Sequence, residues 1–434
     1  MTDSAPATLA PIAGAERIQA LDVIRGFALI GIFLMNVEFF TRPLQDINGD
    51  GIDAAMHGLD YVADALVYFF VQSKFWTLFS LLFGMGFAVM IERAERAGRA
   101  FLPVYLRRTL ALLAIGLGHA LLIWSGDILV SYALAAFVLL LARQARRAHL
   151  LMGWQSRPAP MSAGRLAAWG TSLYGLALVL LLAFGALGSL QAGTVLDSHD
   201  ESAQSSHADE QGAERERAVQ AYSQGSYADA VRQRVRETND QLSDLPEFLP
   251  LVLGVFLIGA AVIRSGWLRD IRANAGRFRT VRDVGLPLGF GLMAISVRGG
   301  TSFSSGQFHL SKAITVVTYL AAGLVLALAY GATVVTLLNT RVGPWLQRWL
   351  APAGRMTLSN YLAQSVIGTL VFYQYGLGNW GQVGRAGQVL FVAVVFTSQL
   401  LFSRWWLARF NYGPMEWLWR AVTYWQWPAM RRLQ

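Results

Sequence analysis

The chain has 434 residues, of which 54% are hydrophobic and only 15% are charged. A soluble protein of this size carries more charge and a disordered chain contains far fewer apolar residues, so both classes are excluded. The absence of cysteine excludes disulfide scaffolds, thiol nucleophiles and cysteine-ligated zinc or iron–sulfur centres. The formal net charge of +9 comes from basic residues between apolar runs, which favours a membrane surface over nucleic acid as the partner.

Apolar segments long enough to cross a bilayer recur along the chain. A spanning helix needs about 20 apolar residues, and lipid offers the backbone no hydrogen bonds, so such segments must be helical. Ten segments meet or approach this length: 22–40, 66–91, 109–124, 127–142, 167–190, 246–263, 283–297, 313–338, 356–375 and 386–404. Segment 127–142 is short, 283–297 contains Pro287, and 66–91 has room to begin as an interfacial helix near Asp60. The expected fold is an all-α, polytopic membrane helical bundle.

The distribution of arginine predicts how the chain is oriented in the membrane. Alternate connections, namely 92–108, 143–166, 264–282 and 339–355, hold nineteen arginines. The opposite connections hold nine lysines and arginines, even when those of the long segment 191–245 are included. By the positive-inside rule, the arginine-rich connections face the cytoplasm. We therefore expect a bacterial inner-membrane protein, surrounded by lipid, with both termini in the cytoplasm.

These crossings divide the chain into five parts. They are a cytoplasmic tail (1–21), the first transmembrane helices (22–190), an extracytoplasmic helical loop (191–245), the remaining transmembrane helices (246–404) and a cytoplasmic interfacial tail (405–434). Residues 1–20 lack the basic start and short apolar core of a cleavable signal, so we expect the first span to be retained. The tryptophan-rich final tail is typical of an interfacial belt.

The long loop 191–245 has its own pattern. It begins with an acidic, serine-rich stretch, Asp197–Gln211, which we expect to be flexible. Apolar residues at near-helical spacing then predict two short helices, Ala213–Tyr222 and Tyr227–Leu242, separated at Gly225. One interpretation is an amphipathic hairpin lying on the outer face. The other is a lid over an outward-facing site.

Polar residues inside the spans give the first candidate site. A charge at the bilayer centre costs about 2.5–3.5 kcal/mol, so such residues need a reason. Four of them are expected at the outer side and form the candidate site: Asn36, His119, Asp127 and Lys74. Two nearby residues are further candidates, His57 and Glu38. A neutral imidazole can accept a proton, an amide or ammonium can stabilise an oxyanion, and a carboxylate can orient the imidazole. Four of these residues also have a structural interpretation. His119 and Asn36 could form ordinary hydrogen bonds between helices, Lys74 could extend its ammonium group to the outer interface, and His57 could be a loop histidine without a special role.

A second polar cluster is expected at the cytoplasmic side. Asp22 and Arg25 share one face of the first span and can form an ion pair. Arg355 precedes the ninth span, and Asn360 and Gln364 lie on one face of that span. Together they could hold an anionic group such as a phosphate, although Arg355 also fits as an ordinary positive-inside marker. The six histidines are too scattered to indicate a metal site.

Several motifs resemble one bacterial family. The chain reads LDVIRGFALIG at 21–31, KFWTLFSLLFG at 74–84, GHA at 118–120, WSGDIL at 124–129, IRSGWL at 263–268, GRMTLSNY at 354–361 and YGPMEWLWR at 412–420. These segments resemble the YeiB-like membrane proteins, which share a domain of unknown function numbered 418. The resemblance extends over about residues 20 to 425.

The first span also resembles that of the transmembrane acyltransferases typified by heparan-α-glucosaminide N-acetyltransferase. In those enzymes an Asp-x-x-Arg-Gly motif is followed by Asn at the offset that separates Asp22 from Asn36. The resemblance implies transfer of an acetyl group from cytosolic acetyl-CoA to a sugar amine on the far side. It also implies a catalytic histidine in the next outer loop. That loop offers His57, at a longer spacing and with poorly matching neighbours, whereas His119 belongs to the YeiB-like pattern.

The sequence leads to the hypothesis of a membrane acyltransferase. An acyl-CoA or acetyl-CoA donor would place its phosphates near Arg25 and Arg355, and His119 or His57 would act as base towards an external small-molecule or glycan acceptor. The hypothesis expects these side chains to meet along one cavity through the bundle. One alternative is a transporter or channel for a small or lipidic solute. Another is a structural or regulatory component that forms a homodimer through its glycine-lined helices.

Overall fold

A computed structural model describes residues 18–44, 46, 51–96, 101–151, 161–192, 212–301 and 308–432. The N-terminal tail up to residue 17 and the acidic stretch Asp197–Gln211 lie outside these ranges. Within them, the regular structure is helical, apart from an isolated bridge between Phe410 and Arg431. The predicted all-α fold is confirmed.

The helices follow one another in a long series. The first half of the chain forms α1 (Gln19–Asn36), η2 (Val37–Phe40), α3 (Gly58–Phe70), α4 (Lys74–Arg96), α5 (Leu102–Leu122), α6 (Leu129–Leu151) and α7 (Ala163–Ala192). After a helix over residues 212–223, the second half forms α9 (Tyr227–Arg264), α10 (Ala275–Arg298), α11 (Leu310–Leu338), α12 (Gly343–Arg355), α13 (Thr357–Phe372), α14 (Arg385–Arg409) and α15 (Pro414–Tyr424). Eight helical segments in the described ranges are long and apolar enough to cross a membrane.

The ten predicted spans all fall on helices, with three differences in detail. The predicted span 66–91 is divided between α3 and α4, because the chain turns at Ser73, which has a positive φ of 64°. The apolar part of α6, Leu129–Arg143, and the 16-residue helix α13 are shorter than a full crossing. The helix predicted to end at Leu242 instead continues into the next span as α9, despite Pro246 and Pro250.

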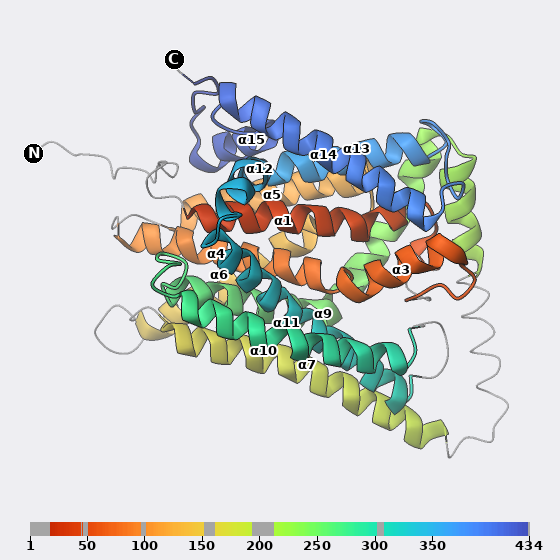
Figure 1. Ribbon diagram of the computed structural model, residues 1–434, viewed down its shortest axis with the longest axis horizontal. Helices are drawn as coiled ribbons and strands as arrows, with labels where there is room; N and C mark the ends of the chain where they lie inside the picture. The colour runs from red at the N-terminus through yellow and green to blue at the C-terminus, as the bar shows by residue number, and fades with distance from the viewer. Residues whose placement is uncertain are drawn as a thin grey trace, which may run out of the picture.

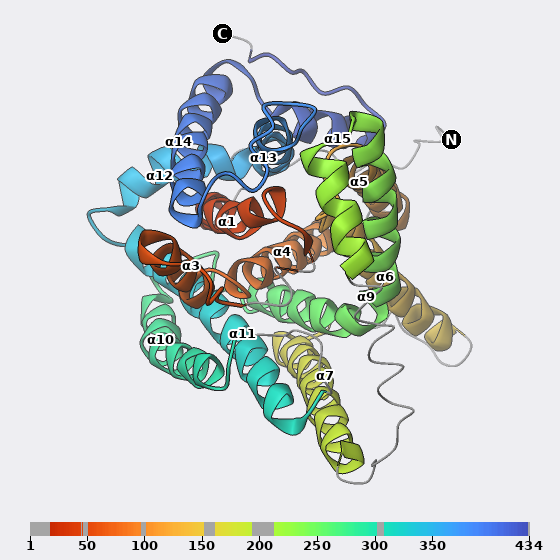
Figure 2. The same ribbon diagram turned by 90° about the vertical axis from the view of Figure 1, so that its right-hand side faces the viewer.

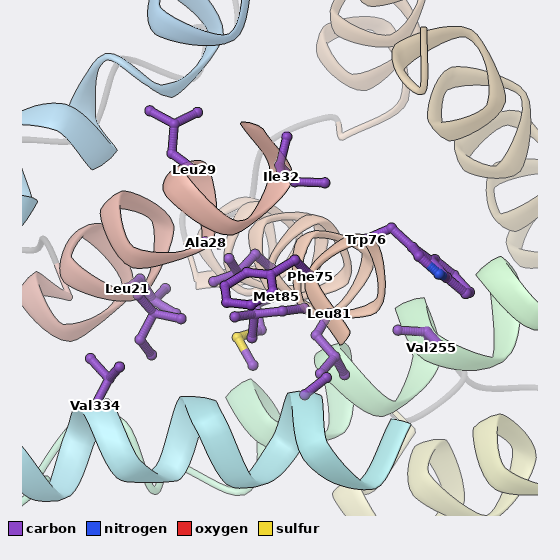
Figure 3. Close-up of a cluster of buried hydrophobic side chains, with 14 of the residues drawn as sticks. Leu21, Ala28, Leu29, Ile32, Phe75, Trp76, Leu81, Met85, Val255 and Val334 are labelled. Atoms are coloured by element: carbon purple, nitrogen blue, oxygen red, sulfur yellow. The ribbon is translucent and has the colours of Figure 1, made fainter. Parts of the chain in front are cut away.

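Helices α1 and α4 form the centre of the bundle. Figure 2 shows them surrounded by α14, α13 and α15 on one side and by α9, α11, α7 and α10 on the other. Aliphatic and aromatic side chains from α1, α4, α9 and α11 pack together between them (Figure 3). The outer helices α7 and α10 bury few of their residues and leave large apolar side chains exposed, such as Leu180, Phe184 and Leu288. Such faces are stable only against lipid or another apolar surface, so the protein is a polytopic membrane protein.

The two ends of the bundle differ in composition. One end, here called the arginine end, contains the start of α1, the end of α4 and the helix α15 (Figure 1). It carries most of the described arginines, including Arg93, Arg264 and Arg355. The opposite end, called the hairpin end, contains α3 and the hairpin formed by the helix 212–223 and the start of α9. The asymmetry agrees with the expected topology, and the assignment of the arginine end to the cytoplasm stays a prediction.

Glycine lets the central helices approach closely. A Cβ atom on Gly84 of α4 would overlap the backbone carbonyl of Phe256 in α9, and one on Gly354 of α12 would overlap that of Asp22 in α1. Close backbone approach at small residues is the usual way in which helices associate in lipid. The predicted packing role of Gly84 is therefore confirmed. Gly86 has a different neighbour, since a Cβ atom there would have the guanidinium of Arg25 as its nearest contact, 3.9 Å away.

We expect Gly84→Ala to destabilise the protein by about 1–3 kcal/mol, because the added methyl group forces α4 and α9 apart. The matched control is Gly175→Ala in α7, where a Cβ atom meets nothing within 4 Å and alanine favours the helix. Thermal unfolding of the two variants in the same detergent compares them. Equal melting temperatures would contradict the close packing of α4 against α9.

Candidate functional site

His119 and Asp127 form a buried pair at the hairpin end. His119 lies in the last turn of α5, and Asp127 lies just before α6. The Asp127 carboxylate accepts two hydrogen bonds, from the backbone N–H of Val130 at 2.8 Å and from Nδ1 of His119 at 2.7 Å. The first bond caps α6 and the second fixes the imidazole. The predicted pairing of these two residues is therefore present, and the pair is called the dyad below.

The dyad leaves one nitrogen of the imidazole available. A carboxylate only accepts hydrogen bonds, so Nδ1 carries the hydrogen and Nε2 of the neutral ring keeps its lone pair. Nε2 is buried and has no hydrogen-bond partner among the described residues. The rings of Tyr361 and Trp124 lie against the imidazole, with centroids 5.2 and 6.1 Å from its own. A buried base with an unused lone pair is the arrangement that general base catalysis requires.

The hairpin is bound by hydrogen bonds to the end of α5 and to the turn between α5 and α6, within the segment that joins the two residues of the dyad. Ser125, two residues before Asp127, donates a hydrogen bond to the Glu237 carboxylate of α9. Arg234 is fully buried and donates to the carbonyl of Leu122, at the end of α5, at 2.8 Å. Tyr222 stacks on Tyr373 with a centroid distance of 4.4 Å. The separation of two helices at Gly225 is confirmed, and their docked position agrees with the interpretation of a lid.

The other residues predicted at this end form no hydrogen bond to the dyad. Asn36 is buried at the end of α1, and its amide makes no hydrogen bond to His119 or Asp127. Lys74 is fully buried, and its ammonium donates to the carbonyl of Tyr68 at 3.1 Å and contacts the sulfur of Met293 at 3.1 Å. Because Tyr68 lies in the last turn of α3, Lys74 acts as a cation at a helix C-terminus. His57 is exposed at the position before α3.

A cluster of buried charges joins three elements at the hairpin end. The fully buried guanidinium of Arg385, at the start of α14, lies 3.1 Å from the carboxylate of Asp64 in α3 and 2.9 Å from that of Glu38 in η2. Glu38 also pairs with Arg42, which reaches Asp53 at 3.0 Å. These five residues are called the ion cluster. Their opposite charges offset one another, so the cluster holds α3 and α14 onto the end of α1.

We expect Arg385→Met to lower the free energy of unfolding by about 3–5 kcal/mol, because Asp64 and Glu38 would remain buried without their cation. The control is Arg298→Met, which removes an exposed arginine at the same end. Chemical unfolding in detergent, followed by tryptophan fluorescence, measures both. A loss no larger than that of the control would show that the ion cluster does not stabilise the fold.

At the arginine end, the predicted pair Asp22 and Arg25 is present, with 3.2 Å between Oδ1 and Nη1. Arg355 ends α12 and donates to the carbonyl of Asn411 at 3.3 Å. Helix α12 crosses the start of α1, where Gly354 touches the backbone of Asp22. Arg25 and Arg355 thus belong to two elements that are in direct contact.

Two further arginines approach Arg25. The guanidinium of Arg108 in α5 lies over the ring of Trp419, 3.7 Å from its centroid, and the Trp419 indole donates to the Arg108 carbonyl at 2.9 Å. Arg420 lies over Tyr412 at 4.9 Å. The charge of Arg108 is close enough to those of Arg25 and Arg420 for each of them to repel it. Aromatic rings hold the guanidinium groups of Arg108 and Arg420 in place, so positive charge is concentrated near the start of α1.

Asn360 and Gln364 hold α13 against α14. The Asn360 amide donates to the hydroxyl of Ser403 at 2.9 Å, and the Gln364 amide donates to the carbonyl oxygen of Gln399 at 2.9 Å. Gln399 returns a hydrogen bond to the Asn360 carbonyl at 2.9 Å. All four side chains are buried. The two predicted donor-binding residues are therefore engaged in contacts between helices, and their part in ligand binding stays a prediction.

Two pockets lie at the hairpin end. The larger, of about 740 Å³, is lined by Asp53, Gly300 and Lys312 among others. The smaller, of about 50 Å³, lies under the hairpin and is lined by Trp124, Glu237 and their neighbours. Neither pocket is lined by Arg25, Asn36, His119 or Arg355, so neither is the expected cavity that joins the two ends.

Comparison with known proteins identifies the family. The model of the family "Protein of unknown function (DUF418)" matches residues 262–426. The uncharacterized protein YxaH of Bacillus subtilis (strain 168) is 34% identical over 98% of both chains. The uncharacterized protein YeiB of Escherichia coli (strain K12) is 31% identical over 94% of this chain and 96% of its own. This chain belongs to the YeiB-like DUF418 family.

Two motifs of this YeiB-like chain meet at the arginine end. The Glu416 carboxylate of α15 accepts hydrogen bonds from the backbone N–H groups of Leu358 and Ser359, at 2.7 and 3.1 Å, and from the Ser359 hydroxyl at 2.6 Å. These contacts cap the first turn of α13. Burial raises the pKa of the Glu416 carboxyl, and the hydrogen bonds from Ser359 oppose this shift. The contact fixes α15, and with it Trp419 and Arg420, next to the start of α1.

Sequence reasoning misses several residues of these sites. The sequence presents Arg108 and Arg420 only as markers of topology, and Arg385 as an outer-loop arginine. Asp64 lies close to a predicted span, where a carboxylate normally pairs with a basic residue, so its position signals that such a partner exists. Glu237 carries no such signal, because the segment around it is polar throughout.

Proposed function

We propose that this YeiB-like protein is an acyltransferase that moves an acyl group from an acyl-CoA at the arginine end to a hydroxyl or amine acceptor at the hairpin end. The observation that supports it is the dyad. A buried imidazole whose Nδ1 is held by a carboxylate, and whose Nε2 is free to accept a proton, is arranged as a general base. The proposal places the arginine end in the cytoplasm of a bacterium, where acyl-CoA is made.

The chemical step follows from the position of Nε2. The acceptor oxygen or nitrogen attacks the thioester carbonyl carbon, and its proton passes to Nε2 of His119. The new C–O or C–N bond forms as the C–S bond breaks, and the imidazolium then gives the proton to the departing CoA sulfur. Asp127 keeps the ring oriented and stabilises its charged form. Asn36 stays the candidate for the oxyanion donor, since it is buried at the same end.

The negative charge of an acyl-CoA donor is complementary to the positive charge at the arginine end. The phosphates of an acyl-CoA are anionic, and Arg25, Arg108 and Arg420 bring three guanidinium groups together there. Arg355 lies on the neighbouring helix end. Since neither of the two pockets at the hairpin end reaches Arg25 or Arg355, the proposal requires the helices around α1 to part when the donor enters.

The alternative of a transporter would use the buried charges as a pathway. Those charges form the ion cluster, in which Arg385 is enclosed by Asp64 and Glu38. Charges that are fully engaged with each other favour fixed packing over passage of a solute. The dyad, which keeps an unused acceptor, favours chemistry.

We expect His119→Gln to reduce acyl transfer by about 10²–10⁴-fold, because glutamine cannot accept the proton. Asp127→Asn should reduce the rate as well, since it no longer fixes the tautomer of the imidazole. The assay follows release of CoA thiol from acetyl-CoA by protein in proteoliposomes, with the periplasmic polar fraction as acceptor mixture. The control, His57→Gln, should keep the wild-type rate. Transfer that persists in His119→Gln would disprove the assignment.

We also expect CoA to raise the melting temperature of the wild-type protein, because binding to the folded state stabilises it. Arg108→Gln should weaken this response about ten-fold or more, through the loss of a guanidinium at the phosphates. The control is Arg272→Gln, an exposed arginine at the same end. If CoA stabilises both variants equally, its phosphates do not bind at Arg108.

A further inference from the structure

The small pocket under the hairpin has an unusual lining. Its lining includes two charged residues, Glu237 and Arg42, and five aromatic residues, Phe39, Trp124, Tyr222, Tyr373 and Trp380. The pocket is directly beside the dyad, because Trp124 lines it and also contacts the imidazole of His119, with 6.1 Å between ring centroids. Whatever enters the pocket is therefore separated from the base by one indole ring.

Glu237 is buried, and the side chains that donate hydrogen bonds to it are all neutral. Its oxygens accept hydrogen bonds from the Tyr222 hydroxyl at 2.7 Å, from the Gln233 amide at 3.1 Å and from the Ser125 hydroxyl. The residue is 6% exposed and forms no ion pair within the described part of the chain. A buried carboxylate is costly unless a cation compensates its charge.

The arginines near the pocket are engaged elsewhere. Arg42 pairs with Glu38 and with Asp53 in the ion cluster. Arg234 donates to the carbonyl of Leu122 at 2.8 Å and to the hydroxyl of Tyr375 at 2.7 Å. Neither guanidinium forms a hydrogen bond to Glu237. Glu237 therefore has no directly bonded cation among the described residues, although the charge of Arg234 acts on it from nearby.

The lining and the volume of the pocket limit the chemical class and the size of the ligand that can bind there. Aromatic faces attract cations, and a ring of aromatic side chains with one carboxylate is a common arrangement for binding an ammonium group. A volume of about 50 Å³ holds about four water molecules. That is room for an aminoethyl head but not for a whole sugar ring or an acyl chain.

We propose that this pocket binds an ammonium head of the acceptor, which makes the acceptor a molecule with an aminoethyl-like end; this inference rests on the proposed acyl transfer. The head is an anchor, because the indole of Trp124 separates the pocket from the base and the pocket has no room for the acyl group. The hydroxyl or amine that receives the acyl group belongs to another part of the same molecule, outside the pocket, and reacts at His119 by the step given above.

Ethanolamine is the probe for this site, and ethylene glycol is its uncharged counterpart of nearly equal size. Melting temperatures of the full-length protein are measured in nanodiscs over a millimolar series of each compound, with sodium chloride at equal ionic strength as the salt control. We expect saturable stabilisation by ethanolamine alone. Glu237→Gln, which keeps the size and the acceptor oxygen, should weaken the response about ten-fold or more. His119→Gln should keep the response while it loses acyl transfer.

A second variant covers the case in which Glu237→Gln does not fold. Gln241 lines the pocket and is only partly buried, so Gln241→Lys should fold and place its own ammonium in the site. It should abolish the ethanolamine response. The inference is overturned if ethylene glycol stabilises as strongly as ethanolamine, or if a folded variant responds like the wild type. An ethanolamine response that depends on Glu237 without any acyl transfer would leave the pocket standing and refute the proposed function alone.

Discussion

The carboxylate of Asp127 organises the hairpin end, because it holds two hydrogen-bond donors from two different helices. One of its oxygens caps α6 through Val130, and the other fixes the imidazole of His119 in α5. The turn between the helices is therefore closed by the same side chain that orients the base. Ser125, in that turn, also holds the hairpin through Glu237. A substitution of Asp127 should thus disturb three features at once: the start of α6, the orientation of the His119 imidazole and the attachment of the hairpin.

Buried polar groups in this protein fall into two kinds. Arg385, and the amides of Asn360 and Gln364, are matched by partners on neighbouring helices, so they contribute packing and register. Nε2 of His119 lacks a partner among the described residues, and the Glu237 carboxylate lacks a cation there. Since an unmatched buried group costs stability, its presence calls for a functional reason. Other buried side-chain atoms also lack a hydrogen-bond partner among the described residues, such as Nε of Arg42 and of Arg234. The two proposals rest on the two groups at or beside the small pocket, His119 and Glu237.

The sequence predicts where the apolar helices and the dyad lie, but it does not predict most of the other polar contacts. Hydropathy locates all ten helical segments, and the short spacing of His119 and Asp127 across one turn makes their pairing predictable. The break at Ser73 escapes prediction because it interrupts an apolar run without glycine or proline. The contact of Asp64 with Arg385 joins residues 321 positions apart, and no local pattern indicates such a pairing. Asn360 and Gln364 are correctly placed on one face, but sequence periodicity cannot tell a neighbouring helix from a ligand.

The separation of the two polar ends sets a requirement on the donor. Arg25 and Asn36 lie on the same helix, about 16 Å apart along its axis. A donor held by its charges at the arginine end must therefore carry its acyl group over that distance on a slender, uncharged arm, since α1 itself buries apolar side chains such as Ala28, Leu29 and Ile32 between the two ends. The pantetheine arm of an acyl-CoA has this character. A compact phosphorylated donor does not, because its charges would have to leave the arginines before its acyl group could approach the dyad.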